Sequence, residues 1–218
     1  MSARILAVDT TSDFGSIALL DGPRVLEEIS LSSPDGFAHI LFDEISSLLV
    51  RHGVTLQQID LFAAASGPGS FTGVRIGLTA VKGLAEATNR PVAAISNLQA
   101  LACFGSRKLR ATLIDARRGE IYGAVYDDAL QPVQDEVVTP LSAWLASLPE
   151  GDLEIIMARM LPVIEETATP IVTAPLALAS AVGRIAAQRL ERGEIQNPEE
   201  VDANYVRRSD AELLWKGL

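Results

Sequence analysis

Residues 65–77 of the sequence read ASGPGSFTGVRIG. The apolar run Leu61–Ala65 at their start predicts a short buried strand, and the periodicity of Gly73–Ala87 predicts a helix after them. A strand, a glycine-rich loop and a helix N-terminus together can bind an anion, because free backbone N–H groups point at the ligand. The stretch therefore predicts a strand–loop–helix unit of an α/β fold and raises the question of a nucleotide site.

The loop matches neither of two common nucleotide-binding templates. A P-loop repeats its glycine after four intervening residues, but counting from Gly67 that position holds Thr72. The dinucleotide fingerprint is spaced GxGxxG, whereas Gly67, Gly69 and Gly73 are spaced GxGxxxG. The alternative is a tight turn in which Ser70 or Thr72 caps the following helix, and the sequence favours it.

Strands and helices are predicted to alternate along the chain. Apolar patterning predicts further strands at Ile5–Asp9, Ser16–Leu20, Val25–Leu31, Pro91–Ser96, Thr112–Asp115, Ile121–Tyr126 and Val133–Val138. It predicts further helices at Phe37–Arg51, Leu141–Leu148 and Leu176–Glu191. This alternation indicates an α/β fold with a mixed sheet in each half.

The two halves share a sequence plan. ILAVDTTSDFGSIALL at 5–20 and ATLIDARRGEIYGAVY at 111–126 each combine a buried strand, a terminal aspartate, a glycine-containing turn and a second strand. Such self-similarity suggests a duplicated unit whose two copies face each other across a cleft. We expect an N-terminal lobe at 1–98, a C-terminal lobe at 99–205, and a tail from about 206–218 that packs back on the first lobe.

The composition is that of an acidic globular protein, with a formal net charge of −10. Proteins that bind nucleic acid alone usually present a basic face, so direct binding is not expected, whereas an acidic surface is suited to a basic protein partner. The single cysteine, Cys103, excludes an intramolecular disulfide and fits a reducing compartment. Because no stretch approaches the ~20 apolar residues that span a bilayer, we expect a soluble cytoplasmic protein with no membrane association.

The helix predicted at Gly73–Ala87 is apolar around most of its circumference. One side carries Gly73, Gly77, Ala80, Leu84 and Ala87, and an adjoining side carries Val74, Leu78, Val81 and Ala85. The apolar arc spans roughly 220°, where a surface helix needs little over 100°. One face can cover the sheet, and the smooth face can approach a second helix closely. That second helix is either Phe37–Arg51 of the same chain or a helix of another subunit.

Two aspartates are the best candidates for catalysis. Asp9 and Asp115 each end an apolar strand, where the active sites of open α/β sheets gather. In a phosphotransferase such aspartates hold magnesium or activate water. The alternative, slightly favoured here, is that they cap the adjacent turns through Thr11 or Arg117.

The remaining reactive side chains favour structural roles. His39 and Asp43 stand four residues apart on a predicted helix and could share a metal, but Ser46 on the same face favours a solvated polar stripe. Cys103 lies in the apolar run LQALACF and is predicted to be a core residue.

These features together resemble the TsaB (YeaZ) family of bacterial proteins. The resemblance runs in register over nearly the whole chain and is carried by ILAVDTTSDFGSIAL, SGPGSFTGVRIG, KGLAEA, IDARRGEIYGAVY and NYVRRSDAE. It implies the two-lobed fold of the actin-like ATPase superfamily, with a ribonuclease-H-like mixed sheet in each lobe. It also implies a role in forming N6-threonylcarbamoyladenosine in tRNAs that read codons starting with A.

The resemblance implies a scaffold that works through partners. Family members form a heterodimer with the catalytic paralogue TsaD by packing the first two helices of each N-terminal lobe together, and the ATPase TsaE docks on the pair. The chain would reach tRNA indirectly, would bind no cofactor or metal alone, and could share a nucleotide at the TsaD interface. A homodimer through the same surface is the expected substitute without TsaD. The expected interface residues are Leu41, Ile45, Gly73, Ile76, Gly77, Ala80 and Leu84.

Three departures bear on catalysis and on local contacts. Asn97–Phe104 holds no histidine, where the catalytic relative has paired metal-binding histidines. The turn Asp9-Thr10-Thr11-Ser12 lacks the glycine of the superfamily's phosphate turn, so Asp9, Thr11 and Asp115 stay weak nucleotide candidates. Gly36 stands where many members carry a histidine. One alternative is an active ATP-dependent kinase or hydrolase, and a second is a metallopeptidase. The absence of an HExxH motif argues against the metallopeptidase.

Overall fold

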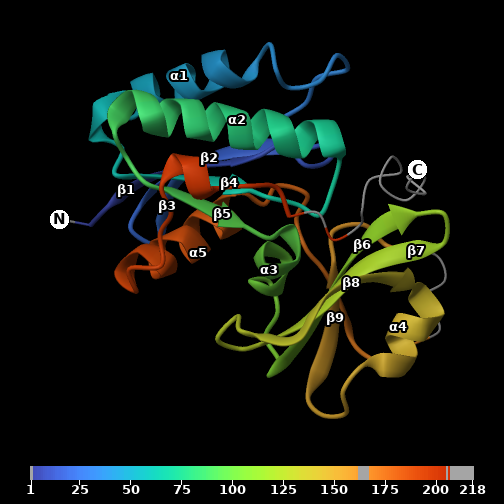
Figure 1. Ribbon diagram of the computed structural model, residues 1–218. Helices are drawn as coiled ribbons and strands as arrows, with labels where there is room; N and C mark the ends of the chain where they lie inside the picture. Colours follow the sequence, from blue (N-terminus) through green and yellow to red (C-terminus); the bar gives the residue numbers. More distant parts are fainter. Residues whose placement is uncertain (1, 162–166, 205, 207–218) are drawn as a thin grey trace, which may run out of the picture.

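The computed structural model describes residues 2–161, 167–204 and 206. Within them the chain forms two lobes, each built on a five-stranded sheet (Figure 1). The first sheet contains β1 Arg4–Asp9, β2 Gly15–Asp21, β3 Arg24–Leu31, β4 Leu61–Ala65 and β5 Val92–Ile95. The second contains β6 Leu109–Arg117, β7 Glu120–Asp127, β8 Pro132–Pro140, β9 Leu153–Met157 and β10 Ile171–Thr173.

The two sheets have the same topology. Their strand orders are β3-β2-β1-β4-β5 and β8-β7-β6-β9-β10. In each, the first three strands form an antiparallel meander, and the first strand also pairs in parallel with the fourth. The predicted α/β fold with a mixed sheet in each half, and the predicted duplication, are confirmed.

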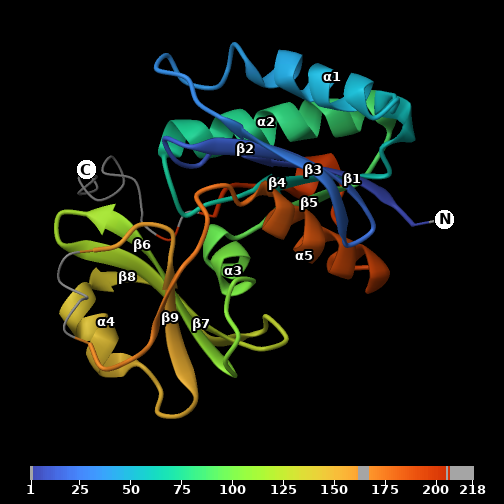
Figure 2. The ribbon, with the colours of Figure 1, turned by 180° about the vertical axis from the view of Figure 1, so that it is seen from behind.

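The central strand β1 is buried on both faces because helices cover both sides of the first sheet. Leu6 and Val8 pack under α1 (Leu41–Arg51) and α2 (Phe71–Thr88), whereas Ile5 and Ala7 face α5 (Ala179–Glu191). Figures 1 and 2 show α1 and α2 together on one face of the sheet and α5 on the other. Successive side chains of a strand alternate between faces, so one apolar run serves both layers.

The second lobe has a smaller core. Trp144, on α4 (Leu141–Ser147), is 2% exposed and packs against the second sheet. Gly123 of β7 makes room for it, because a Cβ there would lie 2.4 Å from Trp144 Nε1. The short helix α3 (Asn97–Ala102) lies between the lobes (Figure 2).

The chain returns to the first lobe after the second sheet. Helix α5 packs on β1, β2 and β4, and its Gly183 is pressed against Leu20. The 3₁₀ turn at Leu56–Gln58 lies in the first lobe, and a second at Pro198–Glu200 precedes Val201, which joins the core under α2. The division at residue 98 stays a prediction, but the segment 99–205 is not confined to the second lobe, because α5 covers an apolar face of the first sheet. The predicted packing of the tail concerns residues that, except Val206, lie outside the described ones.

The carboxylate of Glu136 connects the two lobes through hydrogen bonds. Glu136 of β8 accepts hydrogen bonds from Ser96, which caps α3, from Tyr126 Oη at 2.9 Å, and from Asn204 Nδ2 at 2.6 Å. Asn204 also donates its backbone N–H to Ser66 O at 2.8 Å. The second sheet is thereby tied to the end of β4. Among the described helices, none combines the length and the apolar character needed to cross a membrane.

Candidate functional site

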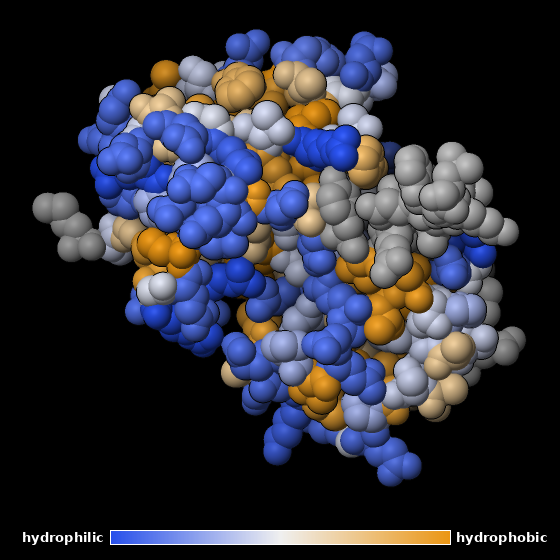
Figure 3. Space-filling model, in the orientation of Figure 1, coloured by the Kyte–Doolittle hydropathy of each residue, from blue (hydrophilic) through white to orange (hydrophobic). Residues whose placement is uncertain are grey.

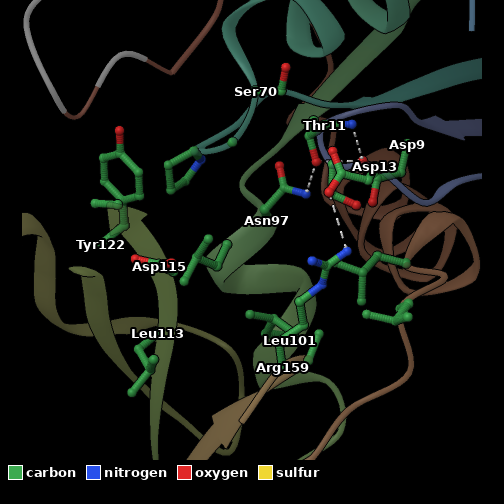
Figure 4. A pocket seen from close by; sticks show the side chains of 18 of the residues that line it. Asp9, Thr11, Asp13, Ser70, Asn97, Leu101, Leu113, Asp115, Tyr122 and Arg159 are labelled. Atoms are coloured by element: carbon green, nitrogen blue, oxygen red, sulfur yellow. Dashed lines mark hydrogen bonds and ion pairs between the residues drawn. The ribbon is translucent and has the colours of Figure 1, made fainter. Parts of the chain in front are cut away.

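The turn after β1 and the loop after β4 are joined by a buried hydrogen-bond network (Figure 4). Thr11 donates its backbone N–H and its hydroxyl to Asp9 Oδ1, at 2.9 and 2.6 Å. Asn97, at the start of α3, donates to Thr11 Oγ1 at 2.7 Å and accepts from Gly67 N at 3.0 Å. All three side chains are buried. Sequence reasoning assigned no role to Asn97, although it is a polar residue that directly follows a predicted strand.

The glycine-rich loop is packed tightly against the first turn. Ser70 N donates to Thr11 O at 2.6 Å, and a Cβ at Gly69 would lie 2.5 Å from the same oxygen. Ser70 Oγ accepts from Gly73 N at 3.3 Å, which confirms the predicted cap of the helix. The backbone donors of Gly67, Ser70 and Gly73 are thus used within the chain.

Burial sets the ionisation of Asp9. Removal from water disfavours the carboxylate and raises the pKa of Asp9 above its ordinary value, although hydrogen bonds from Thr11 and Asn97 act in the opposite direction. The two hydrogen bonds from Thr11 show that Asp9 caps the turn, as one of the two sequence interpretations predicted.

A cavity of about 480 Å³ separates the two lobes at this network. Asp9, Thr11 and Asp115 all line it, so the structure brings the three weak nucleotide candidates to one place. In Figure 4, Asp9 and Thr11 lie on the first-lobe wall, and Asp115 lies with Leu113 and Tyr122 on the facing second-lobe wall. Asp115 Oδ1 accepts from Arg117 N at 2.8 Å, so this aspartate also caps its own turn. It does not end its strand as predicted, because β6 continues to Arg117.

An ion pair crosses the cavity from one lobe to the other. Arg159 Nη2 lies 3.6 Å from Asp13 Oδ2, and the guanidinium carbon is 5.3 Å from the centroid of the Phe14 ring. Both Asp13 and Arg159 line the cavity (Figure 4). The sequence offered no signal for this pair, because its members come from different lobes.

Two predictions for the other reactive residues need correction. Helix α1 begins at Leu41, so His39 precedes the helix that it was predicted to share with Asp43. Cys103 is half-buried and packs against the core without being fully inside it. His39 Nε2 lies 3.4 Å from Ser33 Oγ, and no cluster of three metal-ligating side chains occurs in the described ranges. Burial raises the pKa of the Cys103 thiol to about 11, which keeps it protonated at neutral pH.

The residues expected at a partner interface are mostly inside the chain. Leu41, Ile45, Gly73, Gly77 and Ala80 are buried, and Ile76 and Leu84 are half-buried. The interface itself stays a prediction, but the expected role of Gly77 was wrong.

Gly77 serves the contact between α2 and β1. A Cβ on Gly77 would lie 2.7 Å from Thr10 Oγ1, and one on Gly73 would lie 2.0 Å from Thr10 O. Thr10 Oγ1 also donates to Gly73 O at 2.7 Å. The glycine side of α2 therefore faces its own strand, because only glycine lets the helix approach so closely.

A different surface of the two helices is open. Phe42 and Val50 on α1 are 54% and 75% exposed. On α2, a Cβ added to Gly83 would have no heavy atom within 4 Å. We call the α1–α2 outer face the exposed set Phe42, Ser46, Val50, Thr79, Gly83 and Ala87.

Comparison with known proteins shows that the chain is similar in sequence to proteins of tRNA threonylcarbamoyladenosine biosynthesis. The family model described as "TsaD: tRNA N6-adenosine threonylcarbamoyltransferase" matches residues 32–212. The Bacillus subtilis "tRNA threonylcarbamoyladenosine biosynthesis protein TsaB" is 34% identical over 157 residues, covering 70% of this chain and 69% of that protein. The Escherichia coli protein of the same name is 39% identical over 127 residues, covering 56% of this chain and 54% of that protein.

Solved structures show the same fold. "YeaZ from Pseudomonas aeruginosa" aligns with a TM-score of 0.81 and 29% identity, covering 93% of this chain and 99% of that chain. The activator of the 2-hydroxyisocaproyl-CoA dehydratase from Clostridium difficile aligns with a TM-score of 0.54 at 9% identity, covering 92% of this chain and 99% of that chain. The second likeness concerns the fold alone, and the predicted two-lobed actin-like ATPase architecture is confirmed.

Proposed function

Because the chain belongs to the TsaB (YeaZ) family, we propose that it is a non-catalytic scaffold subunit in the biosynthesis of N6-threonylcarbamoyladenosine in tRNA. In this proposal it binds and activates TsaD, provides a docking place for TsaE, and reaches tRNA only through the complex. A cytoplasmic location follows from the tRNA substrate. A nucleotide shared at the TsaD interface stays a prediction.

The α1–α2 outer face is the observation that carries this proposal. Phe42, Ser46 and Val50 follow one another at i, i+4 spacing on α1, and Thr79, Gly83 and Ala87 do so on α2. Exposed apolar side chains that gather on one surface are typical of interaction sites. Small residues on an outward helix side permit close approach of a second helix, whose axis distance depends on the side chains at the contact.

The packing of the nucleotide-like loop also favours a scaffold role. Ser70 N and Gly73 N, which a phosphate would need, are bonded to Thr11 O and Ser70 Oγ. Gly69 sits so close to Thr11 that even one added methyl group would collide. The alternative is an active kinase or hydrolase, and if such an enzyme held a phosphate at this loop, these contacts would have to open. Tight magnesium-dependent binding of ATP by the isolated chain would support that alternative.

Two measurements test the proposal. The first is tRNA modification reconstituted from TsaD, TsaE, threonylcarbamoyl-adenylate and tRNA, with and without this chain. The second is the affinity for TsaD of Val50→Glu and of Gly83→Leu, with Val133→Glu as the matched control. Val133 is 48% exposed but lies on β8 of the other lobe.

We expect modification to depend on the chain and the two α1–α2 variants to bind TsaD at least about tenfold more weakly, a loss of about 1.4 kcal/mol. All three variants change exposed positions, so each should keep the circular-dichroism spectrum of the parent. Equal tRNA modification with and without the chain would contradict the scaffold role. If both helix variants kept their affinity for TsaD, the α1–α2 outer face would not be the interface, but the scaffold role would still stand.

A further inference from the structure

A second cavity, of about 240 Å³, lies away from the interlobe network. Its walls come from Gln99 of α3, from the β7–β8 turn at 129–132, and from the C-terminal end of α5 with Arg189 and Arg192. It therefore lies where a helix on the first sheet meets a turn of the second. In Figure 3 the surface is hollowed between these two elements, and hydrophilic residues surround the hollow.

Arg189 is a half-buried cation that makes its hydrogen bonds to neutral groups. Its Nη1 donates to Ala94 O and its Nη2 to Gln99 Oε1, each at 2.9 Å. A guanidinium has five N–H donors, so these two bonds leave capacity for an additional acceptor. In the part of the chain that the structure describes, no carboxylate forms an ion pair with Arg189. Burial lowers the pKa of Arg189, and the negative charge of Glu194 acts in the opposite direction.

A second arginine adds to the positive potential of the cavity. Arg192 follows Arg189 by three residues, which places both on one side of the helix end. Gln131, on the β7–β8 turn, and Gln188, on α5, contribute amide groups to the cavity, and Glu194 is the one carboxylate among the described lining residues. Two guanidinium groups against one carboxylate make this cavity locally positive, in a chain whose formal net charge is −10.

We propose that this cavity binds a small oxyanion, a phosphate or a carboxylate group. The planar fork of an arginine matches both groups. A bound anion would add a second negative group to a cavity in which one carboxylate, Glu194, faces the guanidinium groups of Arg189 and Arg192. The volume is below the roughly 300–1,000 Å³ typical of sites for drug-sized ligands, so the ligand is a group of few atoms. Because both lobes supply walls, the bound anion would also hold α5 against the β7–β8 turn. This site is independent of the proposed function.

The test uses the full-length chain and two probes, inorganic phosphate and acetate, each titrated at constant ionic strength with potassium chloride. Binding is followed by the side-chain amide signals of Gln99 and Gln188 in NMR spectra and by the melting temperature. Arg192→Gln removes a cavity charge at an exposed position. Glu194→Gln removes the opposing carboxylate. Arg184→Gln, an exposed arginine on the same helix but outside the cavity, is the matched control.

We expect saturable binding that is about tenfold weaker in Arg192→Gln, tighter in Glu194→Gln, and unchanged in Arg184→Gln. A response to phosphate alone would assign the site to phosphoryl groups, a response to acetate alone would assign it to carboxylates, and a response to both would assign it to oxyanions in general. Absence of saturable binding would overturn the proposal. Equal weakening in Arg192→Gln and Arg184→Gln would overturn it too, because the anion would then sense only overall charge.

Discussion

At the scale of single residues, Asp9 shows how an aspartate at the end of a strand can be used inside the chain. It ends β1, where an enzyme of this fold would place a metal ligand or a base. Here one carboxylate oxygen accepts both the backbone N–H and the hydroxyl of Thr11. Burial raises its pKa despite these bonds, so ionisation of Asp9 is less favourable in the folded state than in the unfolded chain.

This raised pKa predicts a pH-dependent effect of Asp9→Asn. Above the ordinary aspartate pKa of 3.8 the unfolded state has lost its proton, whereas the folded state retains it until the higher folded pKa is passed. The native state then binds more protons than the unfolded state, so the contribution of Asp9 to the free energy of unfolding falls as the pH rises through this window. An asparagine does not titrate and can still accept from Thr11.

We therefore expect Asp9→Asn to gain stability relative to the parent as the pH rises from about 4 towards 7. Urea unfolding of both proteins at each pH measures the difference, and titrations that the two proteins share cancel in it. Two curves that run parallel over the whole range would show that the pKa of Asp9 is the same in the folded and unfolded states.

At the scale of elements, α2 has glycines on two sides with opposite roles. Gly73 lies against Thr10 of the first turn, where a Cβ would be 2.0 Å from the carbonyl oxygen. Gly83, ten residues further along, points to open space. The same residue type therefore brings the helix onto the sheet at one end and leaves a smooth outer surface at the other.

The contrast predicts opposite effects of the same substitution. Gly83→Ala should stabilise the chain by up to about 1 kcal/mol, because alanine is the better helix former. Gly73→Ala should destabilise it by about 1–3 kcal/mol, because the helix must move away from a backbone atom. Thermal and urea unfolding of the two variants measure this difference. Each is the other's control for the change in helix propensity, and equal shifts would contradict the different packing of the two glycines.

At the scale of the whole molecule, the two lobes are not two independent lengths of chain. Helix α5 covers the face of the first sheet that carries Ile5, Ala7 and Leu20, yet it follows the second sheet in sequence. Further along the chain, Asn204 donates hydrogen bonds to Ser66 O at the end of β4 and to the carboxylate of Glu136. The first lobe is complete only when the chain has passed through the second.

A fragment that ends at residue 98 is therefore expected not to fold. Without α5, one apolar face of the sheet would be open to water, and a small domain has little stability to spare. Amide dispersion in NMR spectra and cooperative thermal unfolding measure the outcome. A fragment of residues 1–206, which keeps every described helix and strand, is the control and should unfold cooperatively. A cooperatively folded 1–98 fragment would restore the simple boundary at residue 98.

Elements with strong local patterns could be predicted from the sequence. The predicted strand Leu61–Ala65 coincides with β4, and the predicted helix Leu176–Glu191 contains α5. The strands β9 and β10 were not predicted, because their apolar runs are short and carry no alternation. Helix α3 was expected only as a connection between lobes, since six residues are too few to establish a helical period.

The candidate site could be predicted only in part. Both aspartates could be identified from the sequence, as could the loop whose Ser70 caps α2. The internal repeat predicted a cleft between the two copies, and Thr11 and Arg117, which were predicted as the capping partners of the two aspartates, do donate hydrogen bonds to them. Asn97 and the Asp13–Arg159 pair act across the fold. The position of Asn97 directly after a predicted strand is a weak local signal, whereas nothing in the neighbouring sequence indicates the Asp13–Arg159 pair.

The order of residues along the chain was enough to specify most strands and helices, their apolar faces and the repeated plan, because these features depend on near neighbours in sequence. Which side of α2 lies on the sheet depends instead on contacts that form only in the folded chain. Gly73, Gly77 and Gly83 are identical in sequence terms and differ only in what lies opposite them. For the first two that is Thr10, more than sixty residues earlier in the chain, and for Gly83 it is open space. A glycine in a helix permits a close approach, and only the folded chain shows whether the neighbour is its own strand or another protein.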